Sequence, residues 1–149
     1  MRAIVQRVSS ARVEVAGQTI GAIGRGLCCF VGAGASDTDA DMQYMAGKIV
    51  GLRVFRDDTG KMSKSVKEIE GEVLLISQFT VYGDVRRGRR PSFTRAMPPE
   101  RARETFARFV ERVRAEGVGV ATGQFAADMR VVVDNDGPVS VLIDSQKTF

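Results

Sequence analysis

The chain has 149 residues, 44% of them hydrophobic, which predicts a single domain over residues 1–149 with a sizeable core. The chain contains no histidine, which excludes Ser-His-Asp and Cys-His catalysis and zinc sites of the Cys/His type. The net charge of +4 arises entirely in residues 84–95, so the rest of the chain is balanced. No carboxylate spacing indicates a metal, and we expect no cofactor.

The N-terminus and the cysteines favour a cytoplasmic location. No apolar stretch approaches the roughly 20 residues that cross a bilayer, so no membrane association is expected. Arg2 and Arg7 interrupt what would have to be the apolar part of a signal peptide. Cys28 and Cys29 are adjacent in an apolar run, so in a strand they would face opposite sides and could not pair. We interpret both as packing residues in a reducing compartment.

The first third of the chain is predicted to consist of strands, followed by a helix. The short, partly alternating apolar runs predict strands at residues 3–8, 12–15, 19–23 and 27–31, with glycine-containing hairpin turns at residues 17–18 and 24–26. A helix is expected to open at Asp37, and its apolar residues recur at helical spacing: Met42, Met45, Ala46, Ile49 and Val50.

The remainder mixes strands with one further helix. We expect a helix that begins near Pro99 and ends at Gly117, and residues 61–70 to be loop with at most one helical turn. The expected strands are residues 52–55, 73–76, 118–121, 129–133 and 139–143, with a turn at 134–138. Two helices among roughly nine strands indicate an α+β (mixed α/β) fold with one curved sheet or barrel-like system.

Polar side chains gather where the apolar run at residues 73–76 ends. Residues 77–82, Ser-Gln-Phe-Thr-Val-Tyr, place three hydroxyl groups and an amide beside an arginine-rich segment. On a regular strand Ser77 and Thr80 would face opposite sides, so both can act at one site only if the strand ends or bulges between them. With no histidine to serve as base, this remains a candidate site or simply a polar strand end.

The basic segment is the second candidate. Residues 84–95 hold five arginines against Asp84 alone, and such a focused patch favours a polyanion such as RNA. The alternative is a solvated, flexible loop. A third candidate is Gly137-Pro138, where the absence of a side chain lets backbone approach a ligand, although a simple turn explains it equally.

Taken together, these motifs resemble the D-aminoacyl-tRNA deacylase family. Residues 77–82 resemble the family motif Ser-Gln-Phe-Thr-Leu-Tyr, and residues 135–140 resemble its Gly-Pro-Val-Thr motif. Two departures stand out: Ser140 replaces the usual threonine, and Ala126 occupies a position where glycine is frequent. The likeness runs the length of the chain and includes residues 1–8, 88–93 and 123–129.

The resemblance implies a homodimer that hydrolyses the ester between a D-amino acid and the terminal adenosine of tRNA, and that also acts on glycine mischarged to alanine tRNA. It implies a cis Gly137-Pro138 bond that enters the partner's site and excludes L-amino acids, with Arg7 holding this motif. The implied reaction pocket contains Ser77, Gln78, Phe79 and Thr80. The implied adenosine-binding segment contains Phe125, Ala126 and Met129.

The chemistry leaves two routes open. Thr80 could be a nucleophile, yet nothing in the sequence supplies its base. We favour catalysis by positioning, with backbone donors near residues 77–79 stabilising the oxyanion and the 2′-hydroxyl of the terminal ribose assisting attack. The competing functions are a non-catalytic RNA-binding module and a small-molecule esterase unrelated to tRNA.

Overall fold

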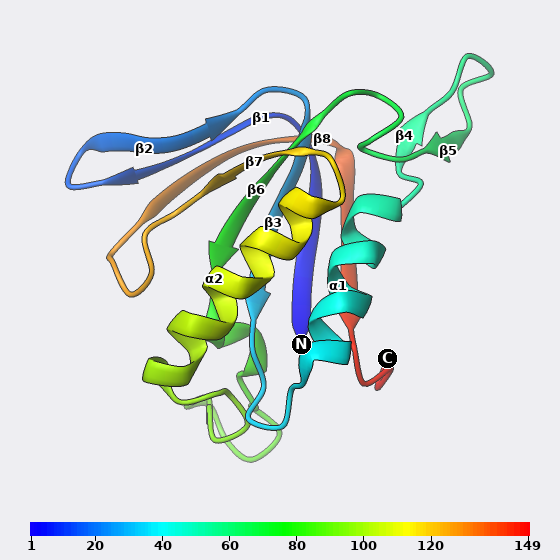
Figure 1. Ribbon diagram of the computed structural model, residues 1–149. Coiled ribbons are helices and arrows are strands. Elements are labelled where there is room, and N and C mark those ends of the chain that lie inside the picture. The colour runs from blue at the N-terminus through cyan, green and yellow to red at the C-terminus, as the bar shows by residue number, and fades with distance from the viewer.

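Two long antiparallel strands form the centre of the molecule (Figure 1). In the computed structural model, which describes residues 1–149, β1 (Arg2–Val15) pairs with β8 (Arg130–Asp144) from Arg2–Asp144 to Glu14–Arg130. The first half of β1 also pairs with β3 (Gly26–Gly32), and its second half pairs with β2 (Gln18–Ile23). β1 therefore has a neighbour on both sides along most of its length.

The sheet continues beyond β3 with two parallel strands and then curls back. The order is β2-β1-β3-β6-β7, with β8 on β1, where the added strands are β6 (Glu72–Ser77) and β7 (Gly119–Thr122). A Cβ on Gly21 of β2 would lie 2.6 Å from the carbonyl oxygen of Thr122 in β7. This close approach shows that the sheet nearly closes, which confirms the expected α+β fold with a barrel-like sheet.

Two helices cover one face of this sheet (Figure 1). They are α1 (Asp39–Gly51) and α2 (Pro99–Ala115), close to the ranges that the sequence predicts. Pro99 occupies the first turn of α2, where its missing N–H costs no hydrogen bond. Asp39 of α1 accepts hydrogen bonds from Arg108 at 2.7 Å and Arg112 at 3.1 Å, which join the exposed sides of the two helices.

Apolar side chains on the two faces of the sheet form separate clusters. The larger cluster holds Cys29 and Leu75 together with the apolar faces of both helices. The smaller cluster holds Cys28 and Leu74 on the other face, within the curve of the sheet. Because Cys29 and Cys28 lie in different clusters, the expectation that they face opposite sides of the sheet is confirmed. Both are buried and unpaired.

Several expected boundaries are wrong. Residues 3–8 and 12–15 belong to one strand, β1. Residues 130–133 and 139–143 belong to one strand, β8, which begins one residue after Met129, so residues 134–138 are no hairpin turn. Residues 136–139 instead form a bulge, because Gln6 pairs with Ser140 while Val8 pairs with Asn135. Both halves of β8 can share one strand because they pair with β1 and not with each other.

A small hairpin projects from the end of α1 (Figure 1). Its strands are β4 (Phe55–Arg56) and β5 (Met62–Lys64), so the strand expected at residues 52–55 begins later and residues 61–70 include a strand. Asp57 stabilises the turn by accepting hydrogen bonds from Thr59 and Ser63. Neither helix of the molecule is both long and apolar enough to span a bilayer.

Candidate active site

The strand that carries the candidate motif ends within it. β6 stops at Ser77, the N–H of Gln78 donates to the carbonyl of Val31 at 2.8 Å, and residues Phe79–Tyr82 form a 3-10 helix, η1. Of the two arrangements that the sequence allowed, the structure has the one in which the strand ends between Ser77 and Thr80. Gly32 makes this turn possible, since a Cβ there would lie 2.8 Å from the Gln78 carbonyl oxygen.

The polar groups of this turn are connected to one another. The Gln78 side-chain amide donates to the Thr80 hydroxyl oxygen at 2.7 Å, and Thr80 is exposed. An amide N–H cannot accept the hydroxyl proton, so this contact orients Thr80 and does not activate it. No side chain caps the start of η1, so its first backbone N–H groups have no partner within the helix. They can therefore bind an oxygen.

Tyr82, the last residue of the motif, has a structural role. Its side chain is buried, and Arg2 lies over its ring with the guanidinium carbon 4.9 Å from the ring centroid. Burial raises the pKa of the Tyr82 phenol, and the carboxylates of Asp37 and Asp144 raise it further. The neutral phenol stays away from the cavity described next, so it is no part of the reaction machinery.

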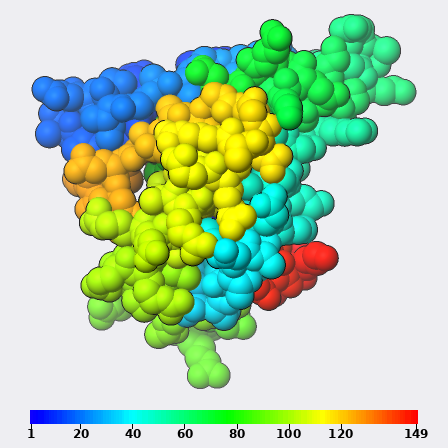
Figure 2. All heavy atoms as spheres, in the orientation of Figure 1, coloured from blue at the N-terminus to red at the C-terminus, as the bar shows by residue number.

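The turn lines a large cavity between the end of β6, the start of α2 and residues 123–131. This cavity has a volume of about 1000 Å³, and 16 of its 23 lining residues are hydrophobic. The surface is hollowed between the orange segment near residue 125 and the first half of α2 (Figure 2). Seven of the ten expected site residues line it: Ser77, Gln78, Phe79, Thr80, Phe125, Ala126 and Met129.

Other lining residues escaped the sequence analysis. Phe106 and Ala102 come from the buried face of α2, and Met97 comes from the segment before it. Their helical spacing is that of ordinary core residues, so no local signal separates them from the core. Phe93 belongs to residues 88–93, which the resemblance includes, and its ring meets that of Phe79 edge-on, with centroids 4.9 Å apart.

Residues 123–129, which contribute to the cavity wall, have an unusual backbone. Ala126 has a φ of +62°, a conformation that favours glycine, which fits the expectation that glycine is frequent at this position. Gly123 has no room for a side chain, since a Cβ would lie 2.6 Å from the sulfur of Met129. This tight turn brings Phe125 and Met129 to the cavity wall.

Gly137-Pro138 lies outside the cavity wall. The peptide bond is cis, and Gly137 has a φ of +126°. The buried Arg7 side chain holds the segment: its Nε donates to the Asp136 carbonyl at 3.1 Å, while its Nη1 donates to the Val54 carbonyl at 2.6 Å. Arg7, Gly137 and Pro138 are absent from the cavity wall of their own chain.

Strand register shows how far apart the two regions are. Arg7 pairs with Leu27 on β3, whereas Ser77 pairs with Val31 on the same strand. Four residues of strand separate Leu27 from Val31, which is about 13 Å. The bulge at 136–139 therefore cannot serve the cavity of its own chain.

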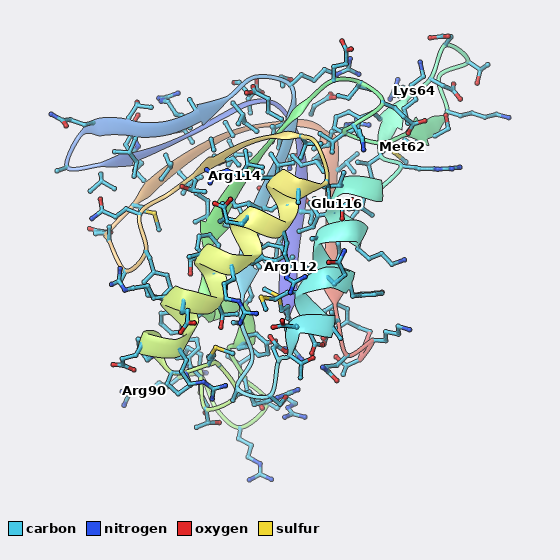
Figure 3. The ribbon with its side chains drawn as sticks, in the orientation of Figure 1. Met62, Lys64, Arg90, Arg112, Arg114 and Glu116 are labelled. Atoms are coloured by element: carbon cyan, nitrogen blue, oxygen red, sulfur yellow. The ribbon has the colours of Figure 1, made fainter.

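The arginine-rich loop lies at the cavity end of the molecule, as the label of Arg90 below the start of α2 shows (Figure 3). Asp84 anchors the loop, because its carboxylate accepts hydrogen bonds from the backbone N–H, the Nε and the Nη2 of Arg86, and its backbone pairs with Ser92. Hydrogen bonds from the Arg86 side chain and backbone lower the pKa of the Asp84 carboxyl. Arg87, Arg89 and Arg90 are exposed and make no ion pair, so three cations remain available to a polyanion.

No group of three or more cysteine, aspartate and glutamate side chains that could hold a metal ion occurs in residues 1–149. Asp128 is the only lining side chain that carries a charge. The site therefore offers hydroxyl, amide and backbone N–H groups in an apolar wall.

Comparisons with known proteins agree with one another. A family model described as D-Tyr-tRNA(Tyr) deacylase matches residues 4–144. The chain is 61% identical to a D-aminoacyl-tRNA deacylase of Sorangium cellulosum and 56% identical to one of Thermotoga petrophila, with 100% of each protein covered in both cases.

Solved structures show the same fold. A structure titled c-Myc DNA Unwinding Element Binding Protein superposes with a TM-score of 0.93 at 42% identity, over 97% of this chain and 98% of that one. A probable eukaryotic D-amino acid tRNA deacylase has a TM-score of 0.83 at 16% identity, over 95% and 97% of the two chains. The family match over nearly the whole chain and the curated relatives together establish that this chain is an enzyme of the D-aminoacyl-tRNA deacylase family.

Proposed function

We propose that the chain hydrolyses the ester of D-aminoacyl-tRNA to a free D-amino acid and tRNA, and so acts in chiral proofreading in the cytoplasm. The observation that carries this proposal is the strand end at Ser77, which brings Thr80, Gln78 and uncapped backbone N–H groups to the wall of one large cavity. An ester carbonyl at this wall would find donors for the oxygen that becomes negative during attack.

The proposed reaction depends on positioning. Since the N–H of Gln78 is taken by Val31, the oxyanion donors are the following groups, the N–H of Phe79 and of Thr80. Water attacks the carbonyl carbon, the ester bond to the ribose 3′-oxygen breaks, and the 2′-hydroxyl relays a proton to that leaving oxygen. Thr80 is oriented by the Gln78 amide and is not the nucleophile, because no basic group contacts it.

The proposed enzyme is a homodimer in which each chain completes the other's site. The Gly137-Pro138 bulge is held rigidly by Arg7 yet stands about 13 Å of strand away from its own cavity. Placed in the partner's cavity, its backbone would face the α-carbon of the amino acid. An L-side chain would push into this wall, whereas a D-side chain would point away, so exclusion is steric. Glycine has no side chain to exclude, so glycyl-tRNA(Ala) is an expected substrate.

The arginine-rich loop is the proposed contact for the tRNA backbone. Its free cations, Arg87, Arg89 and Arg90, are exposed on the same loop as Phe93, which lines the cavity. Phosphate contacts of this kind add affinity and make binding sensitive to salt. A small-molecule esterase would not need them.

Matched D- and L-tyrosyl-tRNA test the proposal. The purified protein is expected to cleave the D-ester rapidly and to leave the L-ester at its spontaneous rate. Equal cleavage of both would contradict the chiral filter. Cleavage of neither, with salt-sensitive tRNA binding retained, would indicate the RNA-binding module instead. Cleavage of simple esters at a rate that does not change when Arg87, Arg89 and Arg90 are replaced would indicate the esterase.

A further inference from the structure

One arginine of α2 is fixed at the cavity wall without an acidic partner. The guanidinium carbon of Arg103 lies 4.8 Å from the ring centroid of Phe125, and Phe125 lines the cavity. A guanidinium stacked on an aromatic face keeps its N–H donors free at its edges. Arg103 is exposed and does not itself line the cavity, so these donors face the solvent beside Phe125.

The other arginines of α2 differ in their surroundings. Arg108 and Arg112 bind Asp39, and Arg114 binds Glu111 at 2.6 Å. Figure 3 shows Arg112 and Arg114 on the later turns of the helix, away from the cavity end. Arg101, like Arg103, is exposed and has no acidic partner, but it makes no contact with an aromatic ring. Arg103 alone combines a free positive charge with a cavity-wall contact.

We propose that Arg103 binds the phosphate that joins the terminal adenosine to the preceding nucleotide. The inference rests on the proposed function, in which residues 125–129 face that adenosine. The terminal nucleoside carries a single phosphodiester, on its 5′ oxygen, and a phosphate cannot enter a wall whose only charged side chain is the carboxylate of Asp128. The phosphate must therefore lie at the mouth, where Arg103 offers a planar fork of donors.

Arg103 and the arginine-rich loop would then divide the RNA between them. Arg103 is held by Phe125 and meets one phosphate at a fixed distance from the ester. The loop arginines are carried by an exposed loop and meet phosphates further along the chain. Only Arg103 is therefore expected to matter for a substrate as short as a dinucleotide.

The test compares D-tyrosyl esters of tRNA, of the dinucleotide cytidylyl-(3′→5′)-adenosine, and of adenosine, which has no phosphate. Arg103→Ala is expected to lower kcat/KM by roughly tenfold on the first two, through KM, and to leave the adenosine ester unchanged. Arg103→Lys keeps the charge without the planar fork and should fall between. Arg101→Ala is the matched control and should behave as wild type on all three.

Two results would overturn the inference: an equal loss on the adenosine ester, or no loss on the dinucleotide ester. Binding of the unacylated dinucleotide and of adenosine separates this failure from failure of the proposed function. If wild type cleaves no ester but Arg103→Ala weakens dinucleotide binding alone, the inference stands and the proposed function is wrong. If D-esters are cleaved and Arg103→Ala matches wild type throughout, the proposed function stands and the inference is wrong.

Discussion

The strand end at Ser77 and the bulge at Gly137-Pro138 are built in opposite ways. Residues 77–80 form the concave wall of a cavity, with side-chain amide and hydroxyl groups turned toward one another. Gly137-Pro138 protrudes from the middle of a long strand, has few polar side-chain atoms, and is held from behind by a buried arginine. The first region has the groups for chemistry and no means of testing chirality, whereas the second has a rigid shape and no reactive group.

The largest effect is expected from the substrate's own ribose. D-tyrosyl-tRNA ending in 2′-deoxyadenosine should be cleaved about 10²–10⁴-fold more slowly, because the proton relay at the leaving oxygen is lost.

The Thr80→Ala variant should lower the cleavage rate by less than about tenfold, since it removes only an orienting hydrogen bond. Single-turnover rates at saturating enzyme measure both. If the Thr80→Ala variant cleaves the ester only at the spontaneous rate while it still binds tRNA, Thr80 is the nucleophile.

The protruding region is tested by Gly137→Ala. A Cβ at Gly137 would lie 2.8 Å from Nη2 of Arg7 and 3.1 Å from the backbone nitrogen of Val139, at a φ of +126°. The ratio of D- to L-tyrosyl-tRNA cleavage should therefore fall by about 10². Gly117→Ala is the control, because Gly117 has a φ of +85° but only the end of Lys67 nearby. A similar loss in both variants would mean that general strain, not the filter, is responsible.

Arg7→Met removes the support behind the bulge. It leaves the buried Val54 carbonyl and the partly buried Asp136 carbonyl without their charged donor, which should lower the free energy of unfolding by about 2 kcal/mol. Urea denaturation gives this value, and the D/L ratio should fall with it. The Arg7→Lys variant keeps the charge but cannot reach both carbonyls, so its D/L ratio should fall more than its free energy of unfolding. Unchanged D/L ratios in both variants would show that Arg7 does not contribute to selectivity for the D-ester.

The smallest effect concerns Ala126 in the cavity wall. Ala126→Gly removes the strain of an alanine held at a φ of +62°, but glycine also raises the entropy of the unfolded chain. The net effect should be a rise of about 0.5 kcal/mol in the free energy of unfolding. Thermal unfolding measures the change. A decrease in stability would show that the methyl group of Ala126 packs usefully in the cavity wall.

The sequence predicts well what depends on local periodicity. The two helices, the buried β6 and the opposite orientation of Cys28 and Cys29 follow from spacing alone. It also limits residues 77–82 to two arrangements, and the structure has the one with a broken strand.

The errors arise where pairing overrides local signals. Residues 134–138 have the composition of a turn, yet β8 continues because β1 pairs with the segments on both sides of the bulge. Residues 61–70 look like loop, and Asp57 organises them into a hairpin through several hydrogen bonds. The α2 residues of the cavity wall, such as Phe106, cannot be told from core residues until the fold places them beside Ser77.

The reactivity of the two buried thiols can report local opening of the structure. Burial raises the pKa of the Cys28 thiol to about 12 and that of Cys29 well above its ordinary value, so neither reacts while its surroundings stay closed. Because one thiol lies beneath the helices and the other within the curve of the sheet, each becomes reactive only when its own layer separates. The labelling rates of variants that keep only one of the two thiols would therefore report the opening of each layer separately, without the introduction of a new cysteine.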